Sequence, residues 1–227
     1  MEKIAAFRRL HRFSDRSQLL FSGVVFCAVG LLAVGAFGGQ YNPTRDIGET
    51  VSSWENLAGV DGKRHGWSEH ATVDFLVVVF TCNSCPYAVD YEERINTFAK
   101  RWQQKGDRVR LIAMNSNTIP EDSLKAMQQR AKERQFVFPY LFDESQEVAR
   151  SFGAVRTPEF FVIDQQRRIR YMGGMDDSAE PAKVTTRYLE DAVEALLAGR
   201  PVPVAETPPV GCMIRSSRRR QSRAKAD

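Results

Sequence analysis

Two cysteines with two residues between them, Cys82 and Cys85, are the residues in this sequence that most clearly indicate a chemical reaction. They follow an apolar run, Phe75 to Phe80, and precede a helical pattern, so both thiols are predicted at the start of a helix. The free N–H groups and the dipole of a helix N-terminus favour a thiolate, which lowers a cysteine pKa. Because about one helical turn separates the two sulfurs, they can form a disulfide. The spacing predicts a dithiol–disulfide redox centre.

The proline after the second cysteine indicates how the pair is oriented. Pro86 lacks an N–H group and is tolerated only in a first helical turn. Cys82 is therefore predicted to be exposed at the helix start, and Cys85 to lie inside the first turn and be more buried. This asymmetry favours Cys82 as the attacking thiol and Cys85 as the resolving thiol. A zinc site is the alternative, but it needs a second pair of ligands. The remaining cysteines and histidines form no paired motif: Cys27, Cys212, His11, His65 and His70.

A buried strand and an amphipathic helix must position the pair. Residues 75–80 are all apolar and mostly β-branched or aromatic, which is typical of a strand buried on both faces. After the cysteines, apolar residues recur at the spacing of one helix face. These residues are Tyr87, Tyr91, Ile95, Phe98 and Trp102.

The rest of the chain alternates between strand and helix patterns. The turn Asp61–Gly62 indicates a β-hairpin before the central strand. Further extended segments are predicted at 109–114, 138–142, 159–164 and 168–172, and helices at 120–131, 146–152 and 189–196. This alternation predicts an α/β sheet with helices on both faces, to which the last two strands add an antiparallel edge.

Composition and charge fit one globular domain with appendages. The 227 residues are 43% apolar and 26% charged, which is ordinary for a folded protein. The net charge of +4 comes from basic ends, whereas the body between them is mildly acidic, so nucleic acid is not expected as a partner. The predicted organisation is a basic segment (1–18), an apolar segment (19–37), a globular domain (47–200) and a tail (201–227). The tail is Pro-rich and then basic, and its last part, from Arg215, is expected to be disordered.

The apolar segment is predicted to be a membrane anchor. Leu19 to Phe37 carries no charge and, as a helix, would span roughly 28 Å, close to the thickness of a bilayer core. The arginines before it favour a cytoplasmic N-terminus and a domain on the extracytoplasmic (periplasmic) side of the cytoplasmic membrane. A cleaved signal peptide is the alternative, with small residues at Ala36 and Gly38. In either case the cysteine pair faces a compartment where disulfides persist.

Several segments together resemble the redoxin family, the alkyl hydroperoxide reductase/thiol-specific antioxidant-like proteins. The resemblance covers about residues 47–214. It rests on Phe80–Tyr87, Asn115–Asn117, Phe138–Asp143, Thr157–Phe161 and Pro209–Ile214. It implies a thioredoxin fold with an N-terminal β-hairpin and an inserted βα unit, here preceded by one transmembrane helix.

The resemblance also implies roles for the residues around Pro158. A cis peptide is expected before Pro158, packed against the sulfurs, and the Thr157 backbone is expected to pair with an extended substrate. The candidate catalytic residues are therefore Cys82, Cys85 and Pro158, with Thr157 and Arg156 as candidate substrate-binding residues. A trans proline opening a strand is the alternative.

Three positions depart from the family pattern. Ser84 stands where relatives commonly have His, which predicts a higher Cys82 pKa and a more reducing pair. Arg156 stands where relatives often have a cysteine, and its guanidinium either stabilises the Cys82 thiolate or lies in solvent. Leu76 occupies the position of the buried carboxylate of thioredoxins, and the nearby Asp74 is expected to be solvated.

These observations favour a membrane-anchored thiol–disulfide oxidoreductase. Its partners would be protein or small-molecule disulfides and thiols and a membrane or extracytoplasmic thiol reductant, and it would need no cofactor or metal. Peroxide reduction is the alternative, although peroxiredoxins have a threonine where this chain has Val79. Metal handling is the third alternative. It usually uses a CxxxC pair and a distal histidine, whereas here the spacing is shorter and both His65 and His70 precede the strand.

The tail contains a further cysteine, Cys212. A proline-led extended segment can fold back over an active-site surface at modest entropic cost. Cys212 is therefore a candidate accessory thiol for the Cys82–Cys85 pair. The alternative is an inert thiol packed against the last helix.

Overall fold

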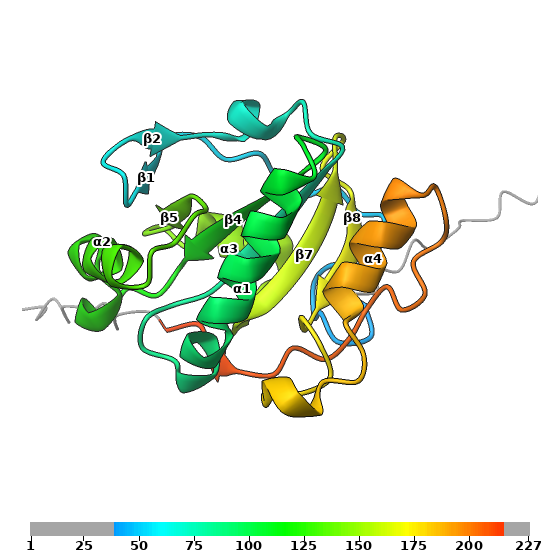
Figure 1. Ribbon diagram of the computed structural model, residues 1–227. Helices are drawn as coiled ribbons and strands as arrows, with labels where there is room; N and C mark the ends of the chain where they lie inside the picture. The colour runs from blue at the N-terminus through cyan, green and yellow to red at the C-terminus, as the bar shows by residue number, and fades with distance from the viewer. Residues whose placement is uncertain (1–38, 216–227) are drawn as a thin grey trace, which may run out of the picture. The chain divides into compact units, whose positions relative to one another are not determined.

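A computed structural model describes residues 39–215 of the chain (Figure 1). The predictions for the basic segment 1–18, the apolar segment 19–37 and residues 216–227 lie outside the described residues. Between residues 39 and 215, no helix combines the length and apolar character needed to cross a membrane.

A mixed sheet of seven strands forms the centre of the domain. The strands are β1 (Leu57–Gly59), β2 (Arg64–His65), β3 (Phe75–Phe80), β4 (Val109–Asn115), β5 (Tyr140–Phe142), β7 (Glu159–Asp164) and β8 (Ile169–Gly173). Their spatial order is β2-β1-β5-β4-β3-β7-β8, with β3 parallel to β4 and antiparallel to β7. The β1–β2 hairpin and the antiparallel β7–β8 edge confirm the predictions for both ends of the sheet.

Four helices cover the two faces of this sheet. They are α1 (Pro86–Gln104), α2 (Leu124–Glu133), α3 (Glu147–Phe152) and α4 (Tyr188–Leu197). Helices α1 and α4 lie on one face and α3 on the other (Figure 1). Successive side chains of a strand point to opposite faces, so β3 serves both layers. Its Val77 and Val79 pack with α1 and α4, whereas Val78 and Phe80 pack with α3. The predicted α/β arrangement is confirmed.

Helix α1 fixes the position of the cysteine pair relative to the sheet. It begins at Pro86 and buries four of the five residues of the predicted stripe. The prediction is wrong for Tyr87, which is 44% exposed. Tyr87 lies in the first turn, beyond the C-terminal end of β3, where the sheet no longer covers the helix.

The tail folds back across the domain. Residues after 200 first pair with β8 beside Met172. They then form β9 (Cys212–Met213), which pairs antiparallel with β6 (Arg156–Thr157) in a separate two-stranded sheet. The described part of the tail is therefore extended, as predicted, and is integrated with the domain beyond the predicted boundary at residue 200.

Candidate active site

The two cysteines lie where β3 ends and α1 begins. The Cys85 carbonyl accepts the first helical hydrogen bond, from the Val89 N–H (3.0 Å), so Cys85 is the N-cap residue and Cys82 lies in the preceding loop. The predicted positions were thus too far along the helix. The predicted exposure of Cys82 is also wrong, since it is 2% exposed and Cys85 is fully buried. Both sulfurs are covered because they pack in one cluster with Ala88, with Cys212 against it.

Both sulfurs contact the turn that precedes β7. Cys82 Sγ lies 3.3 Å from the Thr157 hydroxyl and 3.8 Å from the Ser84 hydroxyl. Cys85 Sγ lies 3.1 Å from the Thr157 carbonyl oxygen. The peptide bond between Thr157 and Pro158 is cis, as expected. Thr157, 75 positions after Cys82 in the sequence, thus forms one site with the cysteine pair.

The two thiols differ in acidity, and the pKa of Cys82 is raised, the direction that Ser84 predicted from the sequence. Burial raises the pKa of the Cys82 thiol, the nearby Asp122 carboxylate adds to this, and the Thr157 hydrogen bond only partly offsets it. At Cys85, burial acts in the same direction, but hydrogen bonds from the Cys212 thiol and from the Ala88 N–H outweigh it and lower the pKa. The lowering expected at a helix N-terminus is therefore found at Cys85. In this reduced state, Cys85 is the better thiolate.

The Thr157 backbone is already paired within the chain. In the register of β6 and β9, Thr157 lies opposite Cys212 and Arg156 opposite Met213. The Cys212 N–H also donates to Cys85 Sγ (3.4 Å). Cys212 is thus beside the cysteine pair, and not against the last helix as in the inert alternative.

Arg156 adopts neither of its two predicted positions. Its guanidinium Nη1 donates to the Gly211 carbonyl (2.8 Å), so it binds the tail. It is among neither the hydrogen-bond partners of Cys82 nor the charges that shift the Cys82 pKa. Its position supports β9 directly.

Asp122 belongs to the site, although its sequence context indicated only the first turn of a helix. Helix α2 begins later, at Leu124, and the Asp122 side chain is fully buried. Its carboxylate accepts hydrogen bonds from the Asn83 N–H (2.7 Å), the Ser84 N–H (3.2 Å) and the Ser84 hydroxyl (2.6 Å). A further bond comes from the Asn117 amide (2.8 Å). Asp122 therefore fixes the two residues between the cysteines.

Glu159 is a second buried carboxylate that sequence reasoning missed. It is 2% exposed, and its Oε2 accepts hydrogen bonds from the Val155 N–H (2.9 Å) and the Arg156 N–H (3.0 Å). Burial raises the pKa of Glu159 to about 7, against the effect of these two bonds. Its signal in the sequence was a glutamate opening an otherwise apolar strand, directly after Pro158. It holds the segment that leads into Thr157.

The position of the buried carboxylate of thioredoxins is occupied by an uncharged residue here, as the sequence indicated. Leu76 is fully buried in β3. Asp74 forms an ion pair with Arg108 (2.6 Å), and its side chain is 36% exposed. The solvated position expected for Asp74 agrees with this.

A model of the Redoxin family matches residues 44–189, most of the described domain. The chain belongs to the redoxin family. It therefore has a thiol-based redox function. Among curated proteins, none shows a significant match.

Solved structures agree with this membership. A hypothetical protein of Sinorhizobium meliloti 1021 is 33% identical, with a TM-score of 0.69, over 76% of this chain and 96% of that protein. An uncharacterised conserved protein of Geobacillus kaustophilus is also 33% identical, with a TM-score of 0.70, over 76% and 93%. A thioredoxin-like protein in the oxidised form is 17% identical, with a TM-score of 0.55, over 68% and 97%. This last similarity shows the fold, which is thioredoxin-like.

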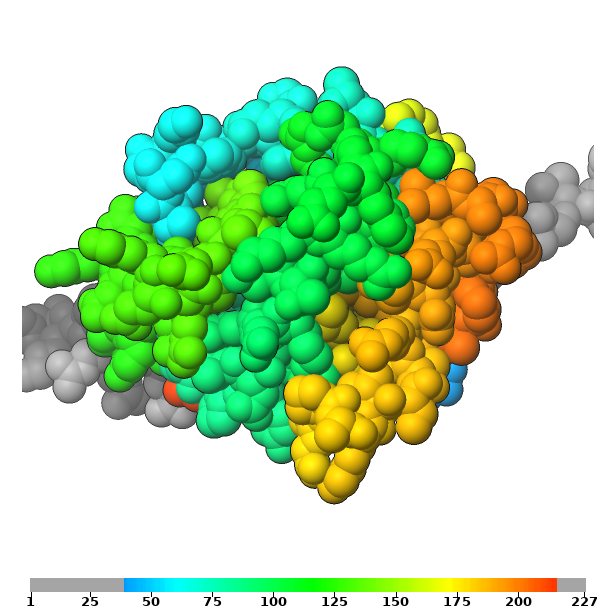
Figure 2. Space-filling model, in the orientation of Figure 1, coloured from blue at the N-terminus to red at the C-terminus, as the bar shows by residue number. Residues whose placement is uncertain are grey.

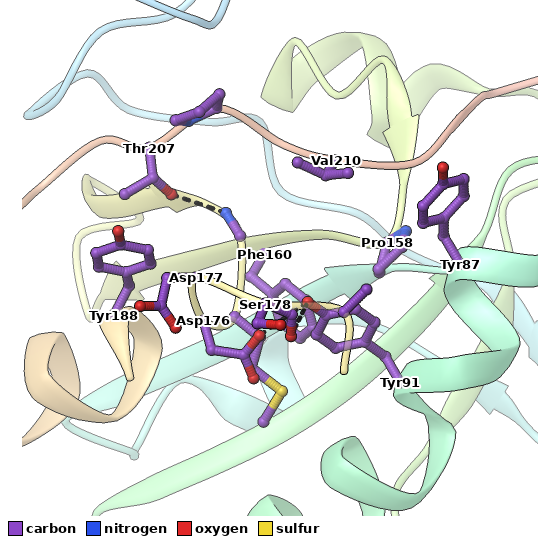
Figure 3. Close-up of a pocket in the computed structure, with 14 residues that line it drawn as sticks. Tyr87, Tyr91, Pro158, Phe160, Asp176, Asp177, Ser178, Tyr188, Thr207 and Val210 are labelled. Carbon is purple, nitrogen blue, oxygen red and sulfur yellow. Dashed lines mark hydrogen bonds between the residues drawn. The ribbon is translucent and has the colours of Figure 1, made fainter. Parts of the chain in front are cut away.

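A pocket of about 260 Å³ lies beside Pro158 in this redoxin domain (Figure 3). Tyr87, Tyr188 and Val210 line it, so one wall comes from the tail. At its base the Tyr91 hydroxyl donates to Asp176 (2.8 Å). Burial and this bond raise the pKa of Tyr91 to about 12, so it remains a donor. The pocket offers aromatic and aliphatic walls next to the Thr157–Pro158 turn.

The face of the redoxin domain that carries α1 shows little of the tail. In Figure 2 the loop between β8 and α4 projects beside the first turn of α1, and the described tail is visible as dark-orange atoms beside α4 and as a small red patch. Both cysteines are buried beneath such surface elements.

The histidines of the described domain lie apart from the sulfurs. His65 contacts the carboxylates of Asp61 (3.1 Å) and Glu69 (2.8 Å). His70 is buried, and neither of its ring nitrogens has a hydrogen-bond partner. From residue 39 to 215, no cluster of three or more histidine, cysteine or acidic side chains could hold a metal ion.

Proposed function

We propose that this redoxin is a thiol–disulfide oxidoreductase that works through Cys82 and Cys85. The observation that carries the proposal is the buried cluster in which both sulfurs contact Thr157, Cys82 through the hydroxyl and Cys85 through the carbonyl. Two thiols next to each other and beside a paired backbone segment form a site for disulfide exchange.

The exchange proceeds in two steps. The Cys82 thiolate attacks one sulfur of a substrate disulfide, and the other substrate sulfur leaves as a thiolate that takes up a proton. The Cys85 thiolate then attacks the Cys82 sulfur, forms the Cys82–Cys85 disulfide and releases the second substrate thiol. Two electrons pass from the pair to the substrate, and a thiol reductant restores them by the reverse exchange. The lowered pKa of Cys85 favours its role as the resolving nucleophile.

Peroxide reduction has weaker support. A peroxidatic thiolate needs a nearby cation or hydrogen-bond donors that lower its pKa. Here the Arg156 guanidinium binds the Gly211 carbonyl and not Cys82. The Val79 side chain is buried in β3 and offers no hydroxyl.

Covalent trapping tests the proposal. In a Cys27→Ser, Cys212→Ser background, a Cys85→Ala variant treated with oxidised glutathione should keep one glutathione on Cys82, because nothing resolves the mixed disulfide. The variant with both cysteines should instead form the Cys82–Cys85 disulfide and release glutathione, as read by mass spectrometry. Failure to form that disulfide would contradict the proposal. Faster turnover of hydrogen peroxide than of oxidised glutathione would favour the peroxidase.

We further propose that the domain is held at the extracytoplasmic side of the membrane by residues 19–37. The support is the uncharged stretch after four arginines. Membranes washed with carbonate at alkaline pH should keep the full-length protein in the pellet. Recovery of a soluble form that begins near Gly39 would show that a signal peptide is cleaved instead.

A further inference from the structure

We propose that Cys212 is a relay thiol, which replaces Cys82 as the disulfide partner of Cys85 by thiol–disulfide exchange. The tail would then be a strand of the chain itself that occupies the position expected for a substrate. This inference rests on the proposed function and adds a third reacting sulfur to it.

Backbone geometry places the tail in the position expected for a substrate. β9 pairs with β6 so that Cys212 lies opposite Thr157. The residue before it must approach the turn closely, because a Cβ atom on Gly211 would clash with the Thr157 carbonyl oxygen. Glycine is the residue that permits such an approach.

Contacts on both sides hold this strand in place. Ile214 N–H donates to the Val155 carbonyl (2.9 Å), and Arg215 N–H donates to the Asn117 side-chain oxygen (2.7 Å). The Arg156 guanidinium binds Gly211 from the other strand (2.8 Å). The tail therefore spans from the end of β4 to β6, across the cysteine pair.

Cys212 lies against Cys85. It packs on the cluster of Cys82, Cys85 and Ala88, and its N–H donates to Cys85 Sγ (3.4 Å). Interaction with the Cys85 thiol is the largest cause that raises the pKa of Cys212, and interaction with Cys212 lowers the pKa of Cys85. In the reduced protein, a thiolate is therefore favoured at Cys85 over Cys212. When Cys85 is in a disulfide with Cys82, it is no longer a thiolate that interacts with Cys212, and Cys212 loses the main cause of its raised pKa.

The relay step is a disulfide exchange that needs no added oxidant. The Cys212 thiolate attacks Cys85 Sγ of the Cys82–Cys85 disulfide. The Cys85–Cys212 bond forms, the Cys82–Cys85 bond breaks, and Cys82 leaves as a thiolate that takes up the proton released by Cys212. The number of disulfides is unchanged.

The relay step would move the disulfide from buried to more exposed sulfurs. Cys82 and Cys85 are 2% and 0% exposed, whereas Cys212 is only partly buried and its neighbour Met213 is 56% exposed. Exchange moves the disulfide from the covered pair to a strand at the surface. A thiol reductant then attacks Cys212 without uncovering the pair.

The test uses the full-length chain with Cys27→Ser, which removes the one other cysteine. A reduced Cys82→Ser variant is treated with one equivalent of oxidised glutathione, quenched in acid, alkylated and digested. Mass spectrometry should find the intramolecular Cys85–Cys212 disulfide as the main product. Adding Gly211→Ala should slow its formation at least about tenfold, because the clash with Thr157 removes the alignment of the two sulfurs.

Two results would overturn the relay. One is a Cys82→Ser product in which Cys85 carries glutathione and Cys212 is free. The other is Cys212 found only in disulfides between two chains. The Cys212→Ser protein distinguishes failure of the relay from failure of the proposed function. It should still form the Cys82–Cys85 disulfide even if the relay is wrong.

Discussion

Replacing Asp122 by alanine should lower the free energy of unfolding by about 3 kcal/mol, because several buried and part-buried donors lose one buried acceptor together. The carboxylate binds the N–H groups of Asn83 and Ser84, the Ser84 hydroxyl and the Asn117 amide. Alanine leaves these groups unpaired in a region that water reaches poorly. Urea denaturation at constant pH measures the loss, and a change within about 0.5 kcal/mol, typical of surface substitutions, would contradict it.

The matched control is Asp122→Asn, which keeps an acceptor oxygen and removes the charge. It should destabilise the protein less than alanine. It should also lower the Cys82 pKa, because the carboxylate is one cause of the raised value. The pH dependence of alkylation of Cys82 in a Cys85→Ala background measures this, and a Cys82 pKa that stays the same or rises would show that the carboxylate does not act on the sulfur.

The contribution of Glu159 to the stability of the wild-type protein should fall between about pH 4.5 and pH 7. Its pKa rises from 4.5 to about 7 on folding, so the folded state retains a proton that the unfolded state releases in this interval. The contribution of Glu159 is complete below pH 4.5 and is lost as pH passes through 7. The shift corresponds to about 3 kcal/mol.

Glu159→Gln isolates this effect, since glutamine keeps an acceptor for Val155 and Arg156 without titrating. Urea denaturation curves of both proteins are measured from pH 4.5 to 8. The difference in unfolding free energy between them should change by about 3 kcal/mol in favour of the variant as pH rises. Parallel pH profiles would show that folding does not change the pKa of Glu159. His65 and His70 titrate in both proteins, so their contributions cancel in the difference between the two unfolding free energies.

The strands and helices could be predicted from the sequence because their signals are local. The apolar run of β3, the Asp61–Gly62 turn and the periodicity of α1 each lie within a short segment, and each element formed as expected. The family resemblance added the turn at Thr157–Pro158, which no local pattern places beside the cysteines. Tyr87 fits the helix period and is nevertheless exposed, since periodicity does not show where a sheet ends.

The environment of the site could not be predicted in the same way. The burial of Cys82 depends on Thr157, 75 residues later, and on packing that includes Cys212. An acid such as Asp122 after a proline is typical of a helix start, and only the folded chain brings it to the CxxC loop. Pairing between β6 and β9 likewise joins segments that share no local signal. These features decide the acidity of the thiols, so the roles derived from helix geometry alone were incomplete.

The position of β9 has a consequence for biosynthesis. The cysteine pair is translated well before Cys212, and the strands and helices up to α4 can form before the tail exists. Domains fold as their N-terminal parts emerge, so the nascent chain presents Cys82 and Cys85 without the part of their cover that Cys212 supplies. The tail, which is made after α4, adds the cover that β9 provides. The sulfurs are therefore expected to react with oxidants more readily before the tail is made than after β9 has paired with β6.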